Sequence, residues 1–215
     1  MDNLTVILFL CVCIPILPAL TLLPDVRSRR FLGFLIVGMA ACLIASWFNS
    51  VLLELMGGDR LYVTTSFTPI AEEIIKTLPV LYYALVFSDD RETLLSISLA
   101  VGLGFALLEN TTILLQNVEY VTIPWAVARG FGAALMHAAC TAMAGMGISY
   151  VRKRRKLFYC GTFSLLIAAV SFHAIFNLLV QSAHRWLAFV WSALIFVPQL
   201  VSAVSRKIKN RERSS

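Results

Sequence analysis

The sequence predicts an all-α fold, a polytopic bundle of about seven transmembrane helices in one integral membrane domain, residues 1–215. Of the 215 residues, 59% are hydrophobic and only 14% are charged, whereas an average soluble domain is about 45–50% apolar and about 25% charged. Since each crossing needs about 20 apolar residues, the chain has room for six to eight helices and none for a sizeable soluble domain. This composition excludes an ordinary soluble enzyme, a disordered chain and a nucleic-acid-binding module.

Apolar runs separated by short polar loops define the expected helices. They lie at residues 4–24, 31–56, 66–88, 93–116, 124–149, 157–180 and 186–205. The first run contains Pro15 and Pro18, so lying at the membrane interface is the alternative to spanning. The chain begins without the positive charges of a signal peptide, and we expect this first run to remain in the mature protein. In the third run, Pro69 is expected to open the helix with Thr68 as its N-cap.

The basic residues predict the orientation of the chain. If the loops alternate across a membrane, one side collects fourteen of the 18 Lys and Arg residues, and the other side has only Arg60 and Arg185. The fourteen are Arg27, Arg29, Arg30, Arg91, the five residues 152–156, and Arg206, Lys207, Lys209, Arg211 and Arg213. Because cytoplasmic loops are enriched in Lys and Arg, we expect the amino terminus outside and the carboxyl terminus in the cytoplasm.

Ionisable and amide side chains recur inside the four middle spans, where a charge costs at least about 2.5–3.5 kcal/mol to insert. They are Glu72, Glu73 and Lys76; Glu109 and Asn110; Arg129 and His137; and His173 and Asn177. Glu72 and Lys76 are one helical turn apart, and so are His173 and Asn177. Intramembrane polar groups of this kind face a protein interior and mark functional sites.

The depth of these residues follows from the helical rise of about 1.5 Å per residue. Glu73, Glu109 and His173 each lie seven residues from the expected outer end of their span, which is about 10 Å below the outer surface. Arg129 falls at a similar depth, and His137 falls deeper, at about 20 Å. The convergence of three helices at one level predicts a site that opens toward the extracytoplasmic face.

The cluster suits hydrolysis by an activated water. A buried glutamate can act as general base or acid, and two imidazoles with a carboxylate, here His137, His173 and Glu109, can hold Zn²⁺. His173 and Asn177 are candidates to hydrogen-bond a developing oxyanion. The sequence has neither G-x-S-x-G nor H-E-x-x-H, so the residues alone indicate no serine nucleophile and do not establish a metal.

Several of these residues also have purely structural interpretations. Glu72 and Lys76 can form an internal ion pair, Arg129 can be a counter-ion, and His137 can join two helices. A recurring set of small residues predicts a close packing face: Ala134, Ala138, Ala142 and Gly145. The five cysteines lie in or beside apolar stretches, which indicates burial and no disulfide framework.

Four ordered motifs run through residues 66–180, which we take as the catalytic core. They are Glu72-Glu73-Ile74-Ile75-Lys76, Gly104-Phe105-Ala106-Leu107-Leu108-Glu109-Asn110, Arg129 with His137, and His173-Ala174-Ile175-Phe176-Asn177. Together they resemble the E-E-x-x-K, G-F-A-x-x-E-N, R…H and H-x-x-x-N elements of PrsW-type intramembrane proteases, a family similar to the type II CAAX prenyl endopeptidases. The other spans contribute only hydrophobicity to this resemblance.

The resemblance implies a glutamate-dependent endopeptidase that a metal such as zinc would assist. Glu72 or Glu73 would activate water, Glu109 would stand where the CAAX relatives carry a histidine, and His173 with Asn177 would support the tetrahedral intermediate. Lys76, Asn110, Arg129 and His137 would have supporting positions. The lysine stands one position earlier than the arginine of the CAAX motif E-E-x-x-x-R, so prenyl-protein processing is not expected.

The resemblance further implies the plasma membrane of a bacterium and a role in stress signalling. The substrate would be a membrane-anchored protein such as an anti-sigma factor, cut first near its extracytoplasmic side. Two other functions stay open at this stage. A proton- or cation-coupled transporter also uses intramembrane Glu, His and Arg, although we find no inverted repeat in the sequence. A non-catalytic scaffold or receptor of the same fold would bind partners without Glu72 or Glu73.

Overall fold

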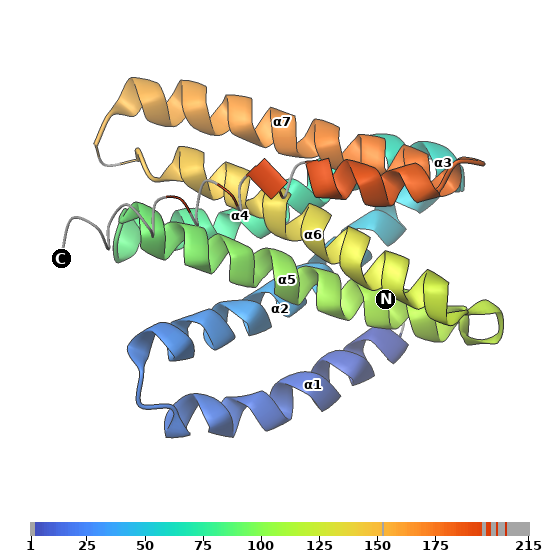
Figure 1. Cartoon of the computed structure of the whole chain (residues 1–215), viewed down its shortest axis with the longest axis horizontal. Helices are drawn as coiled ribbons and strands as arrows, with labels where there is room; N and C mark the ends of the chain where they lie inside the picture. Colours follow the sequence, from blue (N-terminus) through green and yellow to red (C-terminus); the bar gives the residue numbers. More distant parts are fainter. Residues whose placement is uncertain (1–2, 152, 195–196, 199–200, 202–204, 206–215) are drawn as a thin grey trace.

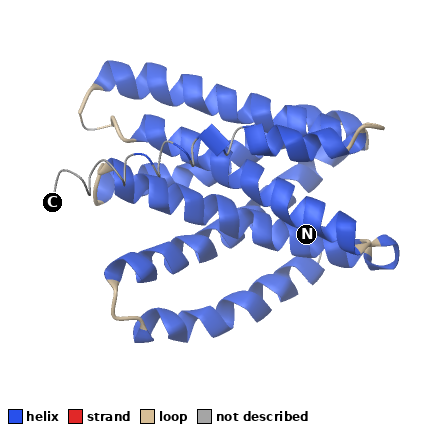
Figure 2. Cartoon of the chain, viewed as in Figure 1, coloured by secondary structure: helices blue, strands red, loops and turns tan. Residues whose placement is uncertain are grey.

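All the regular structure in the computed structural model is helical, as Figure 2 shows for the residues that it describes, 3–151, 153–194, 197–198, 201 and 205. The helices are α1 (Asn3–Leu22), α2 (Val26–Leu55), α3 (Arg60–Tyr62), α4 (Thr68–Val86), α5 (Arg91–Gln116), α6 (Ile123–Ile148) and α7 (Arg155–Gln181). A π-helical turn, Val63–Phe67, joins α3 to α4, a 3-10 turn, Val118–Tyr120, precedes α6, and residues 186–194 are also helical. The predicted all-α class is confirmed.

Five of these helices are long and apolar enough to cross a membrane: α1, α2, α5, α6 and α7. The helix α4 is not among them, because its 19 residues include Glu72, Glu73 and Lys76. The last expected span, residues 186–205, lies partly outside the described residues. Of the seven predicted spans, the structure therefore supports five by length and composition.

The core of the bundle is built around α5, which packs against α2 on one side and α6 on the other (Figure 1). α7 lies along α6, and α4 contacts α2, α6 and α7. α1 and α2 form a helical hairpin. Glycines allow the close approach of α2 and α5: a Cβ on Gly104 would overlap the carbonyl oxygen of Leu35. On α6, Ala138, Ala142 and Gly145 are buried, as the predicted packing face requires, whereas Ala134 lines a cavity.

Side-chain caps determine where several helices begin. The Asp25 carboxylate accepts the Ser28 N–H at the start of α2, and the Asp90 carboxylate accepts the Thr93 N–H at the start of α5, which satisfies amide groups that have no helical partner. The prediction that Thr68 caps the third helix was wrong. Phe67 is the N-cap of α4, its backbone is already helical, and Thr68 lies inside the helix, because the π-helical turn continues directly into α4.

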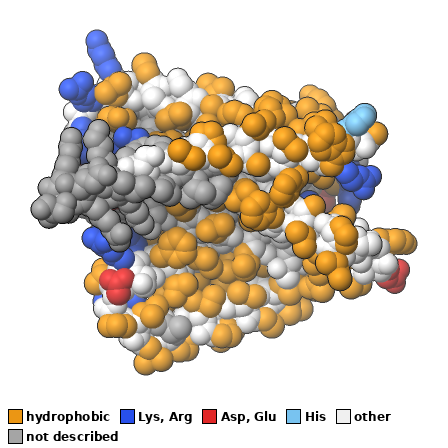
Figure 3. All heavy atoms as spheres, viewed as in Figure 1, with side chains coloured by type: hydrophobic (Ala, Val, Ile, Leu, Met, Phe, Trp, Pro, Cys, Tyr) orange, Lys and Arg blue, Asp and Glu red, His pale blue; other side chains and the backbone are white. Residues whose placement is uncertain are grey.

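The basic loops share one end of the bundle. The Lys153 ammonium, after α6, lies 3.8 Å from the Asp89 carboxylate, and the Arg30 guanidinium, on α2, lies 3.5 Å from the Thr93 hydroxyl on α5. Figure 1 shows the α1–α2 and α6–α7 connections at that end and the α5–α6 connection at the opposite end. Hydrophobic side chains cover the middle of the visible face, and Lys and Arg lie toward its ends (Figure 3).

Candidate active site

The helix α4 carries its three charged residues into the protein interior. Glu73 and Lys76 are completely buried and Glu72 is 4% exposed, and Lys76 Nζ forms an ion pair with Glu73 Oε1. The sequence favoured Glu72 as the partner of Lys76, because the two lie one turn apart. The structure pairs the lysine with Glu73 instead, and Glu72 turns toward α2, where the Asn49 amide Nδ2 donates to its Oε1 at 3.2 Å.

His173, on α7, lies between the two glutamates. Its Nδ1 is 2.8 Å from Glu73 Oε1, and its Nε2 is 3.6 Å from Glu72 Oε2. A carboxylate accepts hydrogen bonds, so Nδ1 carries the ring proton and donates a hydrogen bond to Glu73. In this tautomer Nε2 carries the lone pair, which is directed toward Glu72. A carboxylate that orients an imidazole in this way is the usual second partner of a metal-binding histidine.

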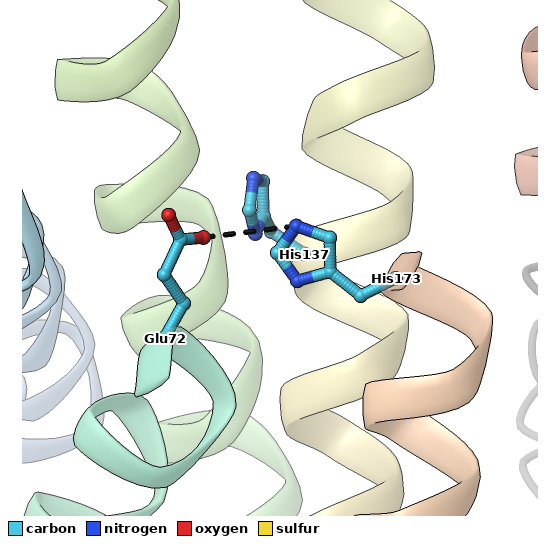
Figure 4. A group of neighbouring side chains, drawn as sticks. All are labelled: Glu72, His137 and His173. Atoms are coloured by element: carbon cyan, nitrogen blue, oxygen red, sulfur yellow. Dashed lines mark ion pairs between the residues drawn. The ribbon is translucent and has the colours of Figure 1, made fainter. Parts of the chain in front are cut away.

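His137, on α6, joins the same group. Its Nδ1 lies 2.8 Å from Lys76 Nζ, its Nε2 lies 3.1 Å from Glu109 Oε2, and its ring centroid is 4.9 Å from that of His173. The side chain of His137 thus meets those of Glu109 and His173, although the sequence predicted that His137 lies about 10 Å deeper. Counting residues from span ends assumes parallel helices and ignores side-chain length, whereas Figure 4 shows both imidazoles approaching Glu72 from neighbouring helices.

Glu109 brings α5 into the site. Its Oε2 contacts His137 and lies 3.7 Å from an Arg129 Nη2, and its side chain is 25% exposed, unlike Glu72 and Glu73. Arg129 therefore acts as the counter-ion that its structural interpretation anticipated. Asn110, the next residue, lines a separate and mostly apolar cavity of about 420 Å³. Neighbouring positions on a helix point about 100° apart, which separates Asn110 from the cluster.

Asn177 also lies apart from the cluster, although it is one turn from His173. Its Nδ2 donates to the Thr64 carbonyl at 2.9 Å, and Gln181 Nε2 reaches the Thr64 hydroxyl at 3.2 Å. These hydrogen bonds fasten α7 to the π-helical turn before α4. The Asn177 amide therefore makes a structural hydrogen bond in the wall of the site.

A cavity of about 320 Å³ opens beside the cluster. Its lining includes Glu72, Glu109, Asn49, Thr68, Phe105 and Arg60. Leu53, near the end of α2, and Gln116, the last residue of α5, also line it, so the cavity extends toward the end of the bundle opposite the basic loops. Glu73 is not part of the lining, which distinguishes the two adjacent glutamates.

The geometry and the ligand types fit a metal ion, which would replace Lys76 or Glu109 as the partner of one His137 nitrogen. Glu72, His137 and His173 each offer one ligand atom, and these atoms all lie within 4.8 Å of one another. Two imidazoles and one carboxylate are a ligand set of catalytic zinc sites, which keep a further position open. Glu72 Oε2 is buried and has no hydrogen-bond partner, as expected of an oxygen that binds a cation. This ligand set differs from the predicted set in its carboxylate, which is Glu72 instead of Glu109.

Comparison with known proteins agrees with this chemistry. The family model "PrsW family intramembrane metalloprotease" matches residues 28–203. The chain belongs to this family. It is therefore a multi-pass membrane peptidase, and the family assignment favours this activity over the transporter and the non-catalytic scaffold. No curated protein and no solved structure matches the chain.

Sequence reasoning missed Asn49. Residues 31–56 contribute only hydrophobicity to the family resemblance, yet Asn49 contacts Glu72 and lines the cavity. The signal was present, because Ser46, Asn49 and Ser50 recur at helical spacing in an otherwise apolar span, and polar residues at such positions face protein or a cavity. All three line the cavity.

Proposed function

We propose that this PrsW-family protease cleaves membrane-anchored proteins near the extracytoplasmic face of the membrane. The observation that carries the proposal is the buried group of Glu72, His137 and His173 beside a cavity that also contains Glu109. Three helices hold a three-ligand set, and a fourth helix adds the Glu109 carboxylate, which contacts His137 and Arg129. A metal-binding group with a carboxylate beside it is the arrangement that hydrolysis by an activated water requires.

The orientation rests on charge. Most of the described basic residues lie in or next to the connections after α1, α4 and α6, which meet at one end of the bundle. The positive-inside rule assigns this end to the cytoplasm, with the amino terminus outside and the carboxyl terminus inside. The cavity extends toward the other end, so substrates would reach it from the extracytoplasmic side. The charged tail, residues 206–215, lies outside the described residues.

Glu72, His137 and His173 would hold the metal, with zinc as the ion that suits these ligands. When bound, such an ion polarises the scissile carbonyl and favours ionisation of water. Glu73 fixes the ring of His173 through Nδ1, and Lys76 lies against both Glu73 and His137. These two residues position the ligands and do not face the cavity.

Glu109 is the candidate general base. Its carboxylate lines the cavity and its charge is balanced by Arg129. Glu109 would accept a proton from the attacking water as the water oxygen bonds to the carbonyl carbon. It would then deliver the proton to the leaving nitrogen as the C–N bond breaks, which leaves one new carboxylic acid and one new amine; transfer of the acid's proton to the amine gives the carboxylate and the ammonium ion. This assignment gives Glu72 and Glu109 separate roles in place of the single base, Glu72 or Glu73, that the resemblance implies.

The substrate class follows from the resemblance and the orientation. A single-span protein that is cut near its outer end, such as an anti-sigma factor in stress signalling, fits a cavity that opens on that side. We place the protein in the bacterial plasma membrane on the same ground.

The test is cleavage of single-span membrane proteins, anti-sigma factors included, by the purified protein in lipid. Wild type should cleave at least one of them, lose activity with a chelator and regain it with Zn²⁺. The Glu72→Gln variant should be inactive, while Glu119→Gln, at an exposed glutamate outside the cavity, should match wild type. Full activity of Glu72→Gln, or activity that resists the chelator, would contradict the proposal.

A further inference from the structure

Three residues on the cavity wall each carry a polar side-chain atom without a hydrogen-bond partner. Asn49 Oδ1, Thr68 Oγ1 and Glu72 Oε2 are all buried and make no hydrogen bond, and all three residues line the cavity. A buried polar atom without a partner costs roughly 1–3 kcal/mol. Glu72 Oε2 belongs to the metal-binding group, but the other two atoms have no role in it.

The Thr68 hydroxyl differs from those of several other threonines. Thr64, Thr65, Thr111 and Thr112 each donate to the carbonyl four residues earlier, whereas the Thr68 hydroxyl makes no hydrogen bond. For Thr68 that carbonyl belongs to Thr64, and it already accepts the Asn177 amide. The π-helical turn also directs the Thr68 N–H to Val63, five residues back. The Thr68 hydroxyl therefore keeps its capacity to donate, on a residue that lines the cavity.

The free oxygen of Asn49 has a specific cause. The Asn49 NH₂ group faces Glu72 Oε1 at 3.2 Å, and a carboxylate accepts hydrogen bonds, so the amide cannot rotate without placing two acceptors together. Oδ1 is therefore held on the other side as an acceptor. The cavity wall thus offers one fixed acceptor, on α2, and one hydroxyl donor, on α4.

We propose that Asn49 and Thr68 bind the main chain of the substrate beside Glu72, Asn49 Oδ1 accepting a peptide N–H and the Thr68 hydroxyl donating to a peptide carbonyl. The inference rests on the proposed protease function and names the part of the substrate that this wall recognises. Inside a membrane, a peptide that leaves its helix to be cut loses its own hydrogen bonds, and each exposed N–H and C=O needs a partner. An acceptor and a donor beside the reacting group supply one partner of each kind. Main-chain recognition also tolerates many side-chain sequences.

The test compares two probes on the purified, zinc-loaded protein in detergent. Trialanine hydroxamate carries a peptide main chain with minimal side chains, and acetohydroxamate carries the same metal-binding group alone. Thr68→Val, which removes the hydroxyl and keeps the shape, should raise the Kd of trialanine hydroxamate about 5–10-fold, the value of one hydrogen bond. It should leave the Kd of acetohydroxamate unchanged. Asn49→Ala should raise the Kd of trialanine hydroxamate by at least the same factor.

Two variants serve as matched controls. Thr111→Val removes a hydroxyl that donates to the Leu107 carbonyl outside this cavity, and Asn117→Ala removes an amide that donates to Ile113 at the end of α5. Both should bind the two probes as wild type does. Equal affinity of Thr68→Val and wild type for trialanine hydroxamate would overturn the subsite while leaving the metalloprotease intact. Wild-type protein that binds neither probe would contradict the metalloprotease function and this inference with it.

Discussion

The site has a closed half and an open half, and adjacent glutamates belong to different halves. Glu73 lies in the closed half, completely buried, with Lys76 and His173 as its partners. Glu72 lies in the open half, on the cavity wall with Glu109, whereas Glu73 does not line the cavity. A buried ion pair such as Glu73–Lys76 is costly to break, and charged groups on a cavity wall are available for chemistry. Variants of the closed half should therefore reduce stability, and variants of the open half should reduce activity.

The largest effect should come from the open half. Glu109→Gln should lower kcat about 10²–10⁴-fold, the usual contribution of a general base, and should leave the unfolding midpoint in detergent near that of wild type, because the side chain is partly exposed. Cleavage assays and thermal unfolding on the same preparation measure both quantities. A stable variant that keeps its kcat would exclude Glu109 as the base.

In the closed half, Glu73→Gln should destabilise the protein by about 3–5 kcal/mol, because Lys76 would remain as a buried charge without its counter-ion. Reversible unfolding of the purified protein measures this loss. The double variant Glu73→Gln with Lys76→Met should recover part of the stability, since neither charge then remains. A stability unchanged by Glu73→Gln would remove the distinction between the halves.

The packing of α5 gives a third comparison. Gly104→Ala should cost about 1–3 kcal/mol, because its Cβ would overlap the backbone of Leu35 on α2. Gly33→Ala, on α2, is the matched control, since no atom lies within 4 Å of its added Cβ. The control should be neutral or slightly stabilising, as alanine is the better helix former. Equal unfolding energies for the two variants would show that α2 and α5 do not approach as described.

The smallest effect concerns the start of α5. The Thr93 backbone N–H, followed by its side chain, lowers the pKa of Asp90 below its usual value, so the ionised cap stabilises the fold above about pH 4 and this contribution is lost as the pH falls through the lowered pKa. Asp90→Ala should cost about 1 kcal/mol at pH 7. The difference between wild type and variant should shrink at pH 3. Unfolding at both pH values checks the sign.

Much of the fold was predictable because a membrane imposes a simple code of long apolar runs and short polar loops. The expected spans 93–116 and 124–149 differ from α5 and α6 by at most two residues at each end. The pairing of polar side chains inside the bundle was harder to predict from the sequence. Spacing along α4 favoured Glu72 as the partner of Lys76, whereas the structure selects Glu73, because the choice depends on where α6 and α7 place their histidines.

The motifs identified residues correctly as polar and intramembrane but could not assign them to one group. His137 meets Glu109 across helices, which no count along one helix reveals. Asn49 lies outside every motif, and its contact with Glu72 depends on the packing of α2 against α4. Asn177 shares a turn with His173 yet bonds to Thr64, because the π-helical turn brings that carbonyl within reach.

The most direct test of the central claim is the zinc content of the purified protein after exhaustive dialysis, measured by mass spectrometry. Wild type and Glu109→Gln should each retain one zinc ion per chain, although only wild type cleaves substrate. Glu72→Gln and His173→Gln should retain none, because each loses one of the three ligands. Zinc that persists in Glu72→Gln, or disappears only in Glu109→Gln, would contradict the assignment of Glu72, His137 and His173 as the metal site.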